Sequence, residues 1–170
     1  MEYNKLCFHG THKNNVSGIL NNGFTASSNE VDDKYLGKGV YFMEEDAKAS
    51  FNFCLGVHKM DRDDIRVIKV LIESSNYLNL INTVEYDEFI KIGNELKKTL
   101  KEAGKSAKVT PGIVLNYIYN NHDKFDFVRH CFTIPCVTEY KTIRRQNIYV
   151  CVKDNNCINI IGEESKKWED

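Results

Sequence analysis

The sequence predicts a single α+β domain, on three observations. The chain has 170 residues, a length that fits one domain with its own hydrophobic core. The predicted strands and helices follow one another in an irregular order, not as repeated βαβ units. No internal repeat, low-complexity tract or Pro/Gly/Ser-rich linker divides the chain, whose two prolines are Pro111 and Pro135. We therefore expect one domain over residues 1–170, with one active site.

Apolar periodicity and chain breakers place the individual elements. In order, the expected elements are a strand at 6–9, a short helix that ends at Gly23, a loop at 24–33, a strand at 39–42, a helix at 45–58, a strand at 65–72, a helix at 83–103, a helix from 111 to 119, and strands at 125–132, 148–152 and 157–161. The last three elements are all strands, which favours an α+β architecture over a doubly wound parallel sheet.

The helix at 83–103 has the clearest pattern. Its apolar stripe consists of Tyr86, Phe89, Ile90, Gly93, Leu96 and Leu100. Acidic residues come early in it, lysines come late, and Gly104 follows its end, as a helix dipole and a glycine C-cap favour. We expect it to pack against the core. The next helix begins with Thr110 as N-cap and Pro111 at the first helical position.

Composition excludes several function classes. The chain has 23 basic and 24 acidic residues, so no global positive field draws it to nucleic acid or to an anionic membrane. No apolar run approaches the ~20 residues that span a bilayer, and the first residues lack a signal-peptide pattern. The six cysteines show neither C-x-x-C nor zinc-site spacing. We expect a cytoplasmic protein with reduced thiols, no bound metal and no membrane partner.

Three short segments in the first third of the chain carry groups suited to chemistry. They are Phe-His-Gly-Thr at 8–11, Gly-Lys-Gly-Val-Tyr-Phe at 37–42 and Ser-Phe-Asn-Phe-Cys at 50–54. Each has a structural explanation when taken alone, because strand-end histidines and turn glycines are common in packing. The glycines at 37 and 39 lack the third glycine and the βαβ context of a Rossmann fingerprint, which excludes that interpretation.

Together, in this order and spacing, the segments resemble the NAD-binding half of poly(ADP-ribose) polymerase-like ADP-ribosyltransferases of the diphtheria-toxin type. The resemblance covers residues 6–55, with one extra residue in the loop at 43–49. It implies a split, antiparallel-rich β-sheet with flanking helices and NAD as co-substrate. It also implies that His9 and Thr11 hold ribose hydroxyls of the adenosine half of NAD.

The resemblance places the nicotinamide of NAD against four residues. Nicotinamide is a flat pyridinium with a carboxamide, so its site needs aromatic faces and hydrogen-bonding groups. Tyr41 and Phe53 supply the faces, and Gly10 lets backbone groups approach the carboxamide. Ser50 lies three residues before Phe53 on the same helix face, where its hydroxyl can add a hydrogen bond.

The last motif strand of the family departs from its pattern in this chain. Polymerising members carry a glutamate between Asn and Tyr, and the matching residues here are Asn147, Ile148 and Tyr149. This register puts Ile148 at the glutamate position. A shift of two residues would put Gln146 there, so neither register supplies a carboxylate, and Glu139 in the preceding segment is the residue that could bring one back from a loop. Without that carboxylate, chain elongation should be lost and chemistry slowed about a hundredfold or more.

A catalytic set of His9, Tyr41 and Ile148 resembles the family's mono-ADP-ribosyltransferases, which lack the glutamate. Such an enzyme cleaves NAD at its nicotinamide-ribose bond and transfers ADP-ribose to a macromolecular acceptor, here expected to be a protein rather than a nucleic acid. Two alternatives stay open. One is an NAD glycohydrolase, in which water replaces the acceptor. The other is a catalytically degenerate module that binds NAD or ADP-ribose.

The acceptor side is less informative. Lys141, Arg144 and Arg145 precede the last motif strand, where they either steer an acidic partner or form a solvated loop. The abundance of Asn and Lys suggests an AT-rich microbial or phage genome. By family-level analogy, we expect a toxin or defence factor that acts as an effector in a target cell.

Overall fold

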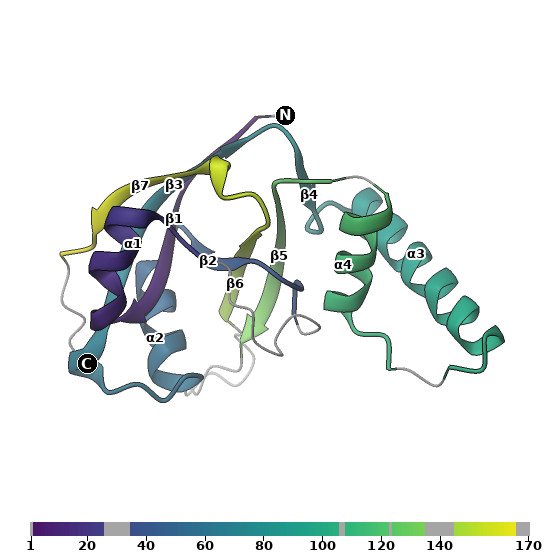
Figure 1. Cartoon of the computed structure of the whole chain (residues 1–170), viewed down its shortest axis with the longest axis horizontal. Helices are drawn as coiled ribbons and strands as arrows, with labels where there is room; N and C mark the ends of the chain where they lie inside the picture. The colour runs from purple at the N-terminus through teal and green to yellow at the C-terminus, as the bar shows by residue number, and fades with distance from the viewer. Residues whose placement is uncertain (1, 26–34, 106–107, 123, 135–144, 166–170) are drawn as a thin grey trace.

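The computed structural model describes residues 2–25, 35–105, 108–122, 124–134 and 145–165 (Figure 1). The strands are β1 (Tyr3–His12), β2 (Val40–Glu44), β3 (Ile65–Ser74), β4 (Tyr77–Asn79), β5 (Phe127–Ile134), β6 (Arg145–Val152) and β7 (Ile158–Glu163). The helices are α1 (Val16–Asn22), α2 (Ala47–Gly56), α3 (Thr83–Glu102) and α4 (Pro111–Asn121). The predicted α+β class is confirmed.

Most elements lie where the sequence places them, with two differences. Most strands are longer than predicted: β1 covers ten residues, because β3 pairs with it along its whole length and so supports polar positions such as Asn4. The sequence did not predict β4, whose three residues are too few for a periodic signal. It pairs parallel with β5, whereas the other strand pairs of the described sheet are antiparallel.

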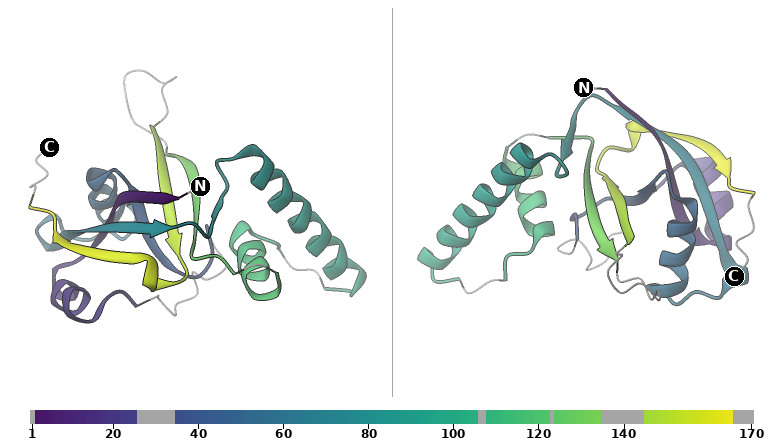
Figure 2. Two further views of the ribbon diagram at one scale, coloured as in Figure 1. Left: turned by 90° about the horizontal axis from the view of Figure 1, so that it is seen from above. Right: turned by 180° about the vertical axis from the view of Figure 1, so that it is seen from behind.

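The seven strands form one sheet in the order β4-β5-β6-β2-β1-β3-β7. Its weakest junction is at the centre, where β1 and β2 share two residue pairs, Cys7 with Glu44 and Phe8 with Met43. Beyond these pairs β1 follows β3 and β2 follows β6, so the two halves of the sheet diverge (Figure 2). The split sheet that the resemblance implies is therefore present, and it opens between His9 and Tyr41.

The sheet buries side chains on both of its faces. On the first face the two halves curl around an apolar cluster of Tyr3, Cys7, Phe24, Val40, Phe42, Ile68, Val70, Ile72, Phe127, Val150 and Val152. On the second face α2 covers β1 and β3 through Phe8, Phe51, Cys54, Ile65 and Val67. The second face continues toward the helices α3 and α4 at the β4–β5 end of the molecule (Figures 1 and 2).

Helix α3 packs less closely than its sequence predicts. Phe89 is its buried residue, while Tyr86 is 39% and Ile90 41% exposed. The reason is that α3 projects from the sheet and its main neighbours are α4 and β4, so one narrow stripe is covered (Figure 1). At Gly93 the two helices come so close that a Cβ atom would lie 3.3 Å from Val114 Cγ2.

Three properties of the described residues concern metal sites, free thiols and membrane-spanning helices. Within them, no group of His, Cys, Asp and Glu could hold a metal ion. Five cysteines are free thiols there: Cys7, Cys54, Cys131, Cys151 and Cys157. None of the helices in the described part of the chain is both long and apolar enough to cross a membrane.

Candidate active site

His9 lies at the point where the sheet splits and bridges the two halves. Its Nδ1 is 2.8 Å from the backbone carbonyl oxygen of Tyr41. A carbonyl oxygen only accepts hydrogen bonds, so Nδ1 carries the proton in this contact. Burial lowers the pKa of His9, which keeps the ring neutral at pH 7. The neutral ring leaves Nε2 as a hydrogen-bond acceptor, the role that a ribose hydroxyl requires.

Two aromatic rings fix the imidazole of His9 from the first face of the sheet. The ring of Phe24 meets it edge-on at 5.1 Å between centroids, and that of Phe42 lies at 5.6 Å. Thr11, on the same face of β1, is 5% exposed and accepts a hydrogen bond from Asn15 Nδ2 at 3.1 Å. The hydroxyl of Thr11 therefore keeps its own proton for a further partner.

The glycine-rich turn before β2 is tightly packed, and Tyr41 holds it together. The hydroxyl of Tyr41 donates to the carbonyl oxygen of Gly37 at 2.6 Å and accepts from the amide of Leu36 at 3.1 Å. A Cβ atom on Gly37 would lie 2.4 Å from Asn116 Oδ1, and one on Gly39 would lie 2.4 Å from the carbonyl oxygen of Val152. Both glycines have positive φ, at 77° and 155°. The motif thus has a packing role besides any ligand role.

Helix α2 brings Ser50 and Phe53 to the second face of the sheet. Asp46 caps the helix by accepting from the amide of Ala49 at 2.8 Å. One turn later Ser50, which is 2% exposed, donates its hydroxyl proton to the carbonyl oxygen of Phe8 at 2.7 Å. Its oxygen can still accept a hydrogen bond. Gly10 permits this approach, since a Cβ atom there would lie 2.4 Å from the carbonyl oxygen of Ser50.

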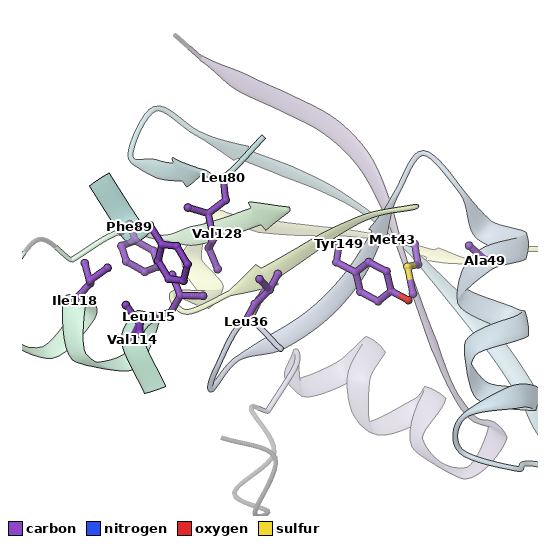
Figure 3. Close-up of a cluster of buried hydrophobic side chains, with 12 residues drawn as sticks. Leu36, Met43, Ala49, Leu80, Phe89, Val114, Leu115, Ile118, Val128 and Tyr149 are labelled. Atoms are coloured by element: carbon purple, nitrogen blue, oxygen red, sulfur yellow. The ribbon is translucent and has the colours of Figure 1, made fainter. Parts of the chain in front are cut away.

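The ring of Phe53 belongs to a series of aromatic contacts on the second face. It meets the ring of Tyr149 edge-on at 6.0 Å, and Tyr149 meets Phe132 at 5.0 Å. Figure 3 shows Tyr149 beside Met43, in the same buried cluster as Ala49 of α2. Burial raises the pKa of Tyr149. Sequence reasoning used Tyr149 to align β6 but did not count it as a site residue.

The register of β2 and β6 decides which side chains of β6 share a face with Tyr41. Tyr41 pairs with Cys151 and Met43 pairs with Tyr149, and residues opposite each other in an antiparallel pair point to the same face. Since successive side chains alternate, Asn147 lies on the face of Tyr41 while Ile148 lies on the other face. The structure thus does not bring the side chains of Ile148 and Tyr41 together. The catalytic role of Ile148 stays a prediction.

The two alternatives to Ile148 add no carboxylate to the described structure. Gln146 is exposed and, like Ile148, lies on the face opposite to Tyr41. Glu139, Lys141 and Arg144 lie outside the described residues, and Arg145 begins β6. The predicted acceptor-side cations therefore stay predictions.

One residue that served to align the last motif strand, but was not counted among the site residues, has an unusual environment. Asn147 is 6% exposed. Within the described residues, its Oδ1 is the buried side-chain nitrogen or oxygen atom that has no hydrogen-bond partner. Buried polar atoms are almost always paired, so this oxygen needs an explanation. The motif alignment names Asn147, but the sequence does not show that its side chain is buried and its oxygen unpaired, because both depend on the tertiary fold.

Comparison with known proteins agrees with the geometry. The poly(ADP-ribose) polymerase catalytic domain model matches residues 2–124. The match covers more than half of the chain and includes all three motifs, so the chain belongs to the poly(ADP-ribose) polymerase catalytic domain family. This is a family of ADP-ribosyltransferases. The match ends before β5 and β6, so it does not extend to the strand of Ile148.

One relative of this chain is described only as an uncharacterized protein. An uncharacterized protein of Methanocaldococcus jannaschii is 26% identical over 155 residues, which cover 82% of this chain and 69% of that protein. No solved structure matches this chain.

Proposed function

We propose that this protein is a mono-ADP-ribosyltransferase that cleaves NAD at its nicotinamide-ribose bond and transfers ADP-ribose to a macromolecular acceptor. The observation that carries the proposal is the split between β1 and β2. There the imidazole of His9 donates a hydrogen bond to the backbone carbonyl oxygen of Tyr41, and the two faces of the sheet carry different functional groups. The first face has His9 and Thr11 for hydroxyl groups, and the second has Tyr41, Ser50 and Phe53 for the nicotinamide.

The two faces suit the two halves of NAD. The neutral imidazole of His9 offers an acceptor for a ribose hydroxyl on the first face. On the second face, the aromatic faces of Tyr41 and Phe53 suit the flat, cationic nicotinamide ring, by stacking and by cation–π attraction. A dinucleotide that passes through the split would reach both sets of groups. NAD is therefore the proposed co-substrate.

The proposed chemistry needs little acid–base assistance from the protein. The bond between C1′ of the ribose and the pyridinium nitrogen breaks, and its electron pair leaves with nicotinamide, which departs as a neutral molecule. The transition state resembles the oxocarbenium ion of glycoside cleavage. The acceptor nucleophile then bonds to C1′ and releases its proton to solvent. The site has to position the two reactants and stabilise the developing cation.

The absence of a carboxylate in the described part of β6 supports transfer of a single ADP-ribose. Gln146, Asn147 and Ile148 are all uncharged. Elongation requires activation of a ribose hydroxyl on the ADP-ribose already attached, a task for a general base. With none at this strand, the reaction should stop after one unit. The net charge of −1 supports a protein acceptor over a nucleic acid. A role as a toxin or defence effector belongs to the same proposal.

The test follows labelled ADP-ribose. Purified protein is incubated with a cell lysate and NAD labelled in its adenylate part, and the products are treated with protease or nuclease. His9→Asn keeps an amide near the position of Nδ1, so the bridge to Tyr41 can persist while the acceptor Nε2 is lost. His122→Asn is the matched control, because His122 is exposed at the end of α4.

Each product pattern has one meaning. Protease-sensitive label with wild type and His122→Asn, but not with His9→Asn, is the expected result. Nuclease-sensitive label would identify a nucleic acid acceptor instead. Free ADP-ribose without labelled macromolecules would identify an NAD glycohydrolase, and a ladder of polymers would contradict single transfer. Intact NAD with wild type would leave a binding module and overturn the proposed reaction.

A further inference from the structure

Asn147 combines burial with an unused hydrogen-bonding atom. Its side chain is 6% exposed, and its Oδ1 has no partner within the described structure. Leaving a buried acceptor unpaired destabilises the fold, and an apolar residue at this position would avoid that cost. Such a cost is expected where a ligand supplies the missing donor.

The position of Asn147 in the sheet links it to the nicotinamide face. Asn147 pairs with Phe132 of β5, whose ring contacts Tyr149, and Tyr149 in turn contacts Phe53 of α2. All these contacts lie on the face of Tyr41, as the register requires. Two strand residues span about 6.8 Å, so Asn147 lies one side-chain position beyond Tyr149 along the same face.

The strand β6 also changes its neighbours at this position. The last pair between β2 and β6 is Met43 with Tyr149, and β2 ends at Glu44. At Asn147, therefore, β5 lies on one side, and in the described structure no strand pairs with β6 on the other. The unpaired oxygen thus occurs just past the end of β2, next to the aromatic rings that line the nicotinamide face.

We infer that Asn147 is a substrate-positioning residue whose Oδ1 accepts a hydrogen bond from the nicotinamide riboside half of NAD. The donor groups in that half are the carboxamide NH₂ and the ribose hydroxyls. The inference rests on the proposed function, since it takes NAD as the ligand. It makes Asn147 the β6 residue that shares the nicotinamide face with Tyr41, which Ile148 and Gln146 do not.

The same geometry separates a ligand role from a structural one. A structural amide stabilises the fold, so its removal lowers stability. Here the free protein gains nothing from Oδ1, and replacing an unpaired polar group by an apolar group of similar size is neutral or stabilising. Asn147→Leu should therefore keep or raise the melting temperature while it weakens NAD binding. Opposite changes in the two quantities are typical of residues kept for function.

The experiment measures calorimetric affinities of the full chain for NAD, nicotinamide and ADP-ribose, together with melting temperatures. For NAD, Asn147→Leu should lose about tenfold in affinity, the effect of one hydrogen bond. Asn147→Asp retains an acceptor oxygen in either protonation state and should stay within about threefold of wild type. Asn159→Asp, at an exposed position of β7, is the matched control and should bind like wild type.

The two fragments identify the donor. Lost affinity for nicotinamide would assign the carboxamide, and lost affinity for ADP-ribose would assign a ribose hydroxyl. Wild-type NAD affinity in Asn147→Leu, or a loss of affinity that accompanies a lower melting temperature in that variant, would overturn this inference alone. A wild-type chain that binds none of the three compounds would overturn the proposed function as well.

Discussion

His9 shows how one residue serves both the fold and the site. Its Nδ1 holds the backbone of Tyr41 across the split, and the burial that makes this contact possible also lowers the pKa of the ring. The same neutral state gives Nε2 its acceptor character. Protonation would turn Nε2 into a donor and place a charge among Phe24 and Phe42. Acid should therefore weaken both the fold and ligand binding.

The first prediction is a loss of stability at acid pH. The folded pKa of His9 lies below its unfolded value of about 6.5, so the unfolded chain binds more protons as pH falls past that value. Stability is complete above about pH 6.5 and decreases below it. His130, whose pKa burial also lowers, acts in the same direction. Thermal unfolding between pH 5 and 8 measures the effect.

Its control is His9→Asn, which has no titratable group at that position. This variant should show a flatter pH dependence than wild type, and His9→Asn combined with His130→Asn a flatter one still. Identical slopes for wild type and the double variant would contradict the assignment of the effect to these two rings.

The second prediction concerns Gly10. In Gly10→Ala the new Cβ atom would lie 2.4 Å from the backbone oxygen of Ser50, so α2 must move away from β1. We expect a loss of about 1–3 kcal/mol in unfolding free energy, the usual cost of overpacking, together with lost NAD binding. Gly18→Ala is the matched control. Nothing lies within 4 Å of a Cβ atom at Gly18, so this change should stabilise helix α1 by about 0.5–1 kcal/mol.

Urea titrations of both variants provide the measurement. If Gly10→Ala were as stable as Gly18→Ala, the close approach of α2 to β1 would not hold in solution.

At the scale of elements, an ion pair with a buried carboxylate joins two strands that are not neighbours in the sheet. Arg129 of β5 forms two hydrogen bonds with Glu44 of β2, at 2.9 Å from Nε to Oε2 and 2.8 Å from Nη2 to Oε1. The hydroxyl of Tyr3 on β1 donates to the same Oε2 at 2.9 Å. The Glu44 carboxylate thus links three strands across the central junction, where backbone pairing is short.

The third prediction is that this pair is strongly coupled. Arg129→Met leaves the 4%-exposed carboxylate of Glu44 without its cation, which should cost about 3–5 kcal/mol in unfolding free energy. Arg129→Met with Glu44→Leu removes both charges and should recover at least half of that loss. A double-mutant cycle by chemical denaturation measures the coupling. Strictly additive effects would show that the two side chains do not interact.

How far the sequence predicts the elements and the site depends on how local each signal is. Helix α4 was placed correctly by Thr110 and Pro111, whose capping chemistry lies within a few residues. The three motifs carried the family resemblance because each is contiguous. The pair of Arg129 and Glu44, in contrast, joins positions 85 residues apart.

The face on which a β6 side chain lies is a property of register. The sequence of β6 alone does not determine which residue of β2 each of its residues pairs with. The sequence therefore aligned Ile148 by motif, whereas the structure places Asn147 on the face of Tyr41. The short strand β4 was missed for a related reason, because β5 rather than its own sequence stabilises it.

At the scale of the whole molecule, the proposed NAD site spans the two halves of the sheet. A ligand bound there contacts β1 in one half and β2 in the other, and it binds the folded chain alone. Binding of the ligand therefore stabilises the entire fold by mass action, and not only one half of the sheet. The helical lobe of α3 and α4 adjoins one half through its contacts with β4 and the cluster around Leu115 (Figure 3).

The fourth prediction is a ligand-dependent melting temperature. NAD at a hundred times its Kd should add about 2.7 kcal/mol to the unfolding free energy, a shift on the order of 5–10 °C for a chain of this size. His9→Asn should show a smaller shift at the same NAD concentration, because its Kd is higher. Differential scanning fluorimetry is sufficient. An equal shift in both proteins would show that NAD binds without using His9.

The order of the strands also governs when an active enzyme can exist during its synthesis. The three motifs lie within the first 54 residues, but Tyr41 needs Cys151 beside it to complete its sheet. A ribosome that has made β1, α2 and β3 has therefore produced all three of these motifs, but neither the last motif strand in β6 nor a finished site. Until residue 152 has emerged, β2 is an unpaired edge open to other chains. The proposed activity should therefore begin only when translation of the sheet is complete.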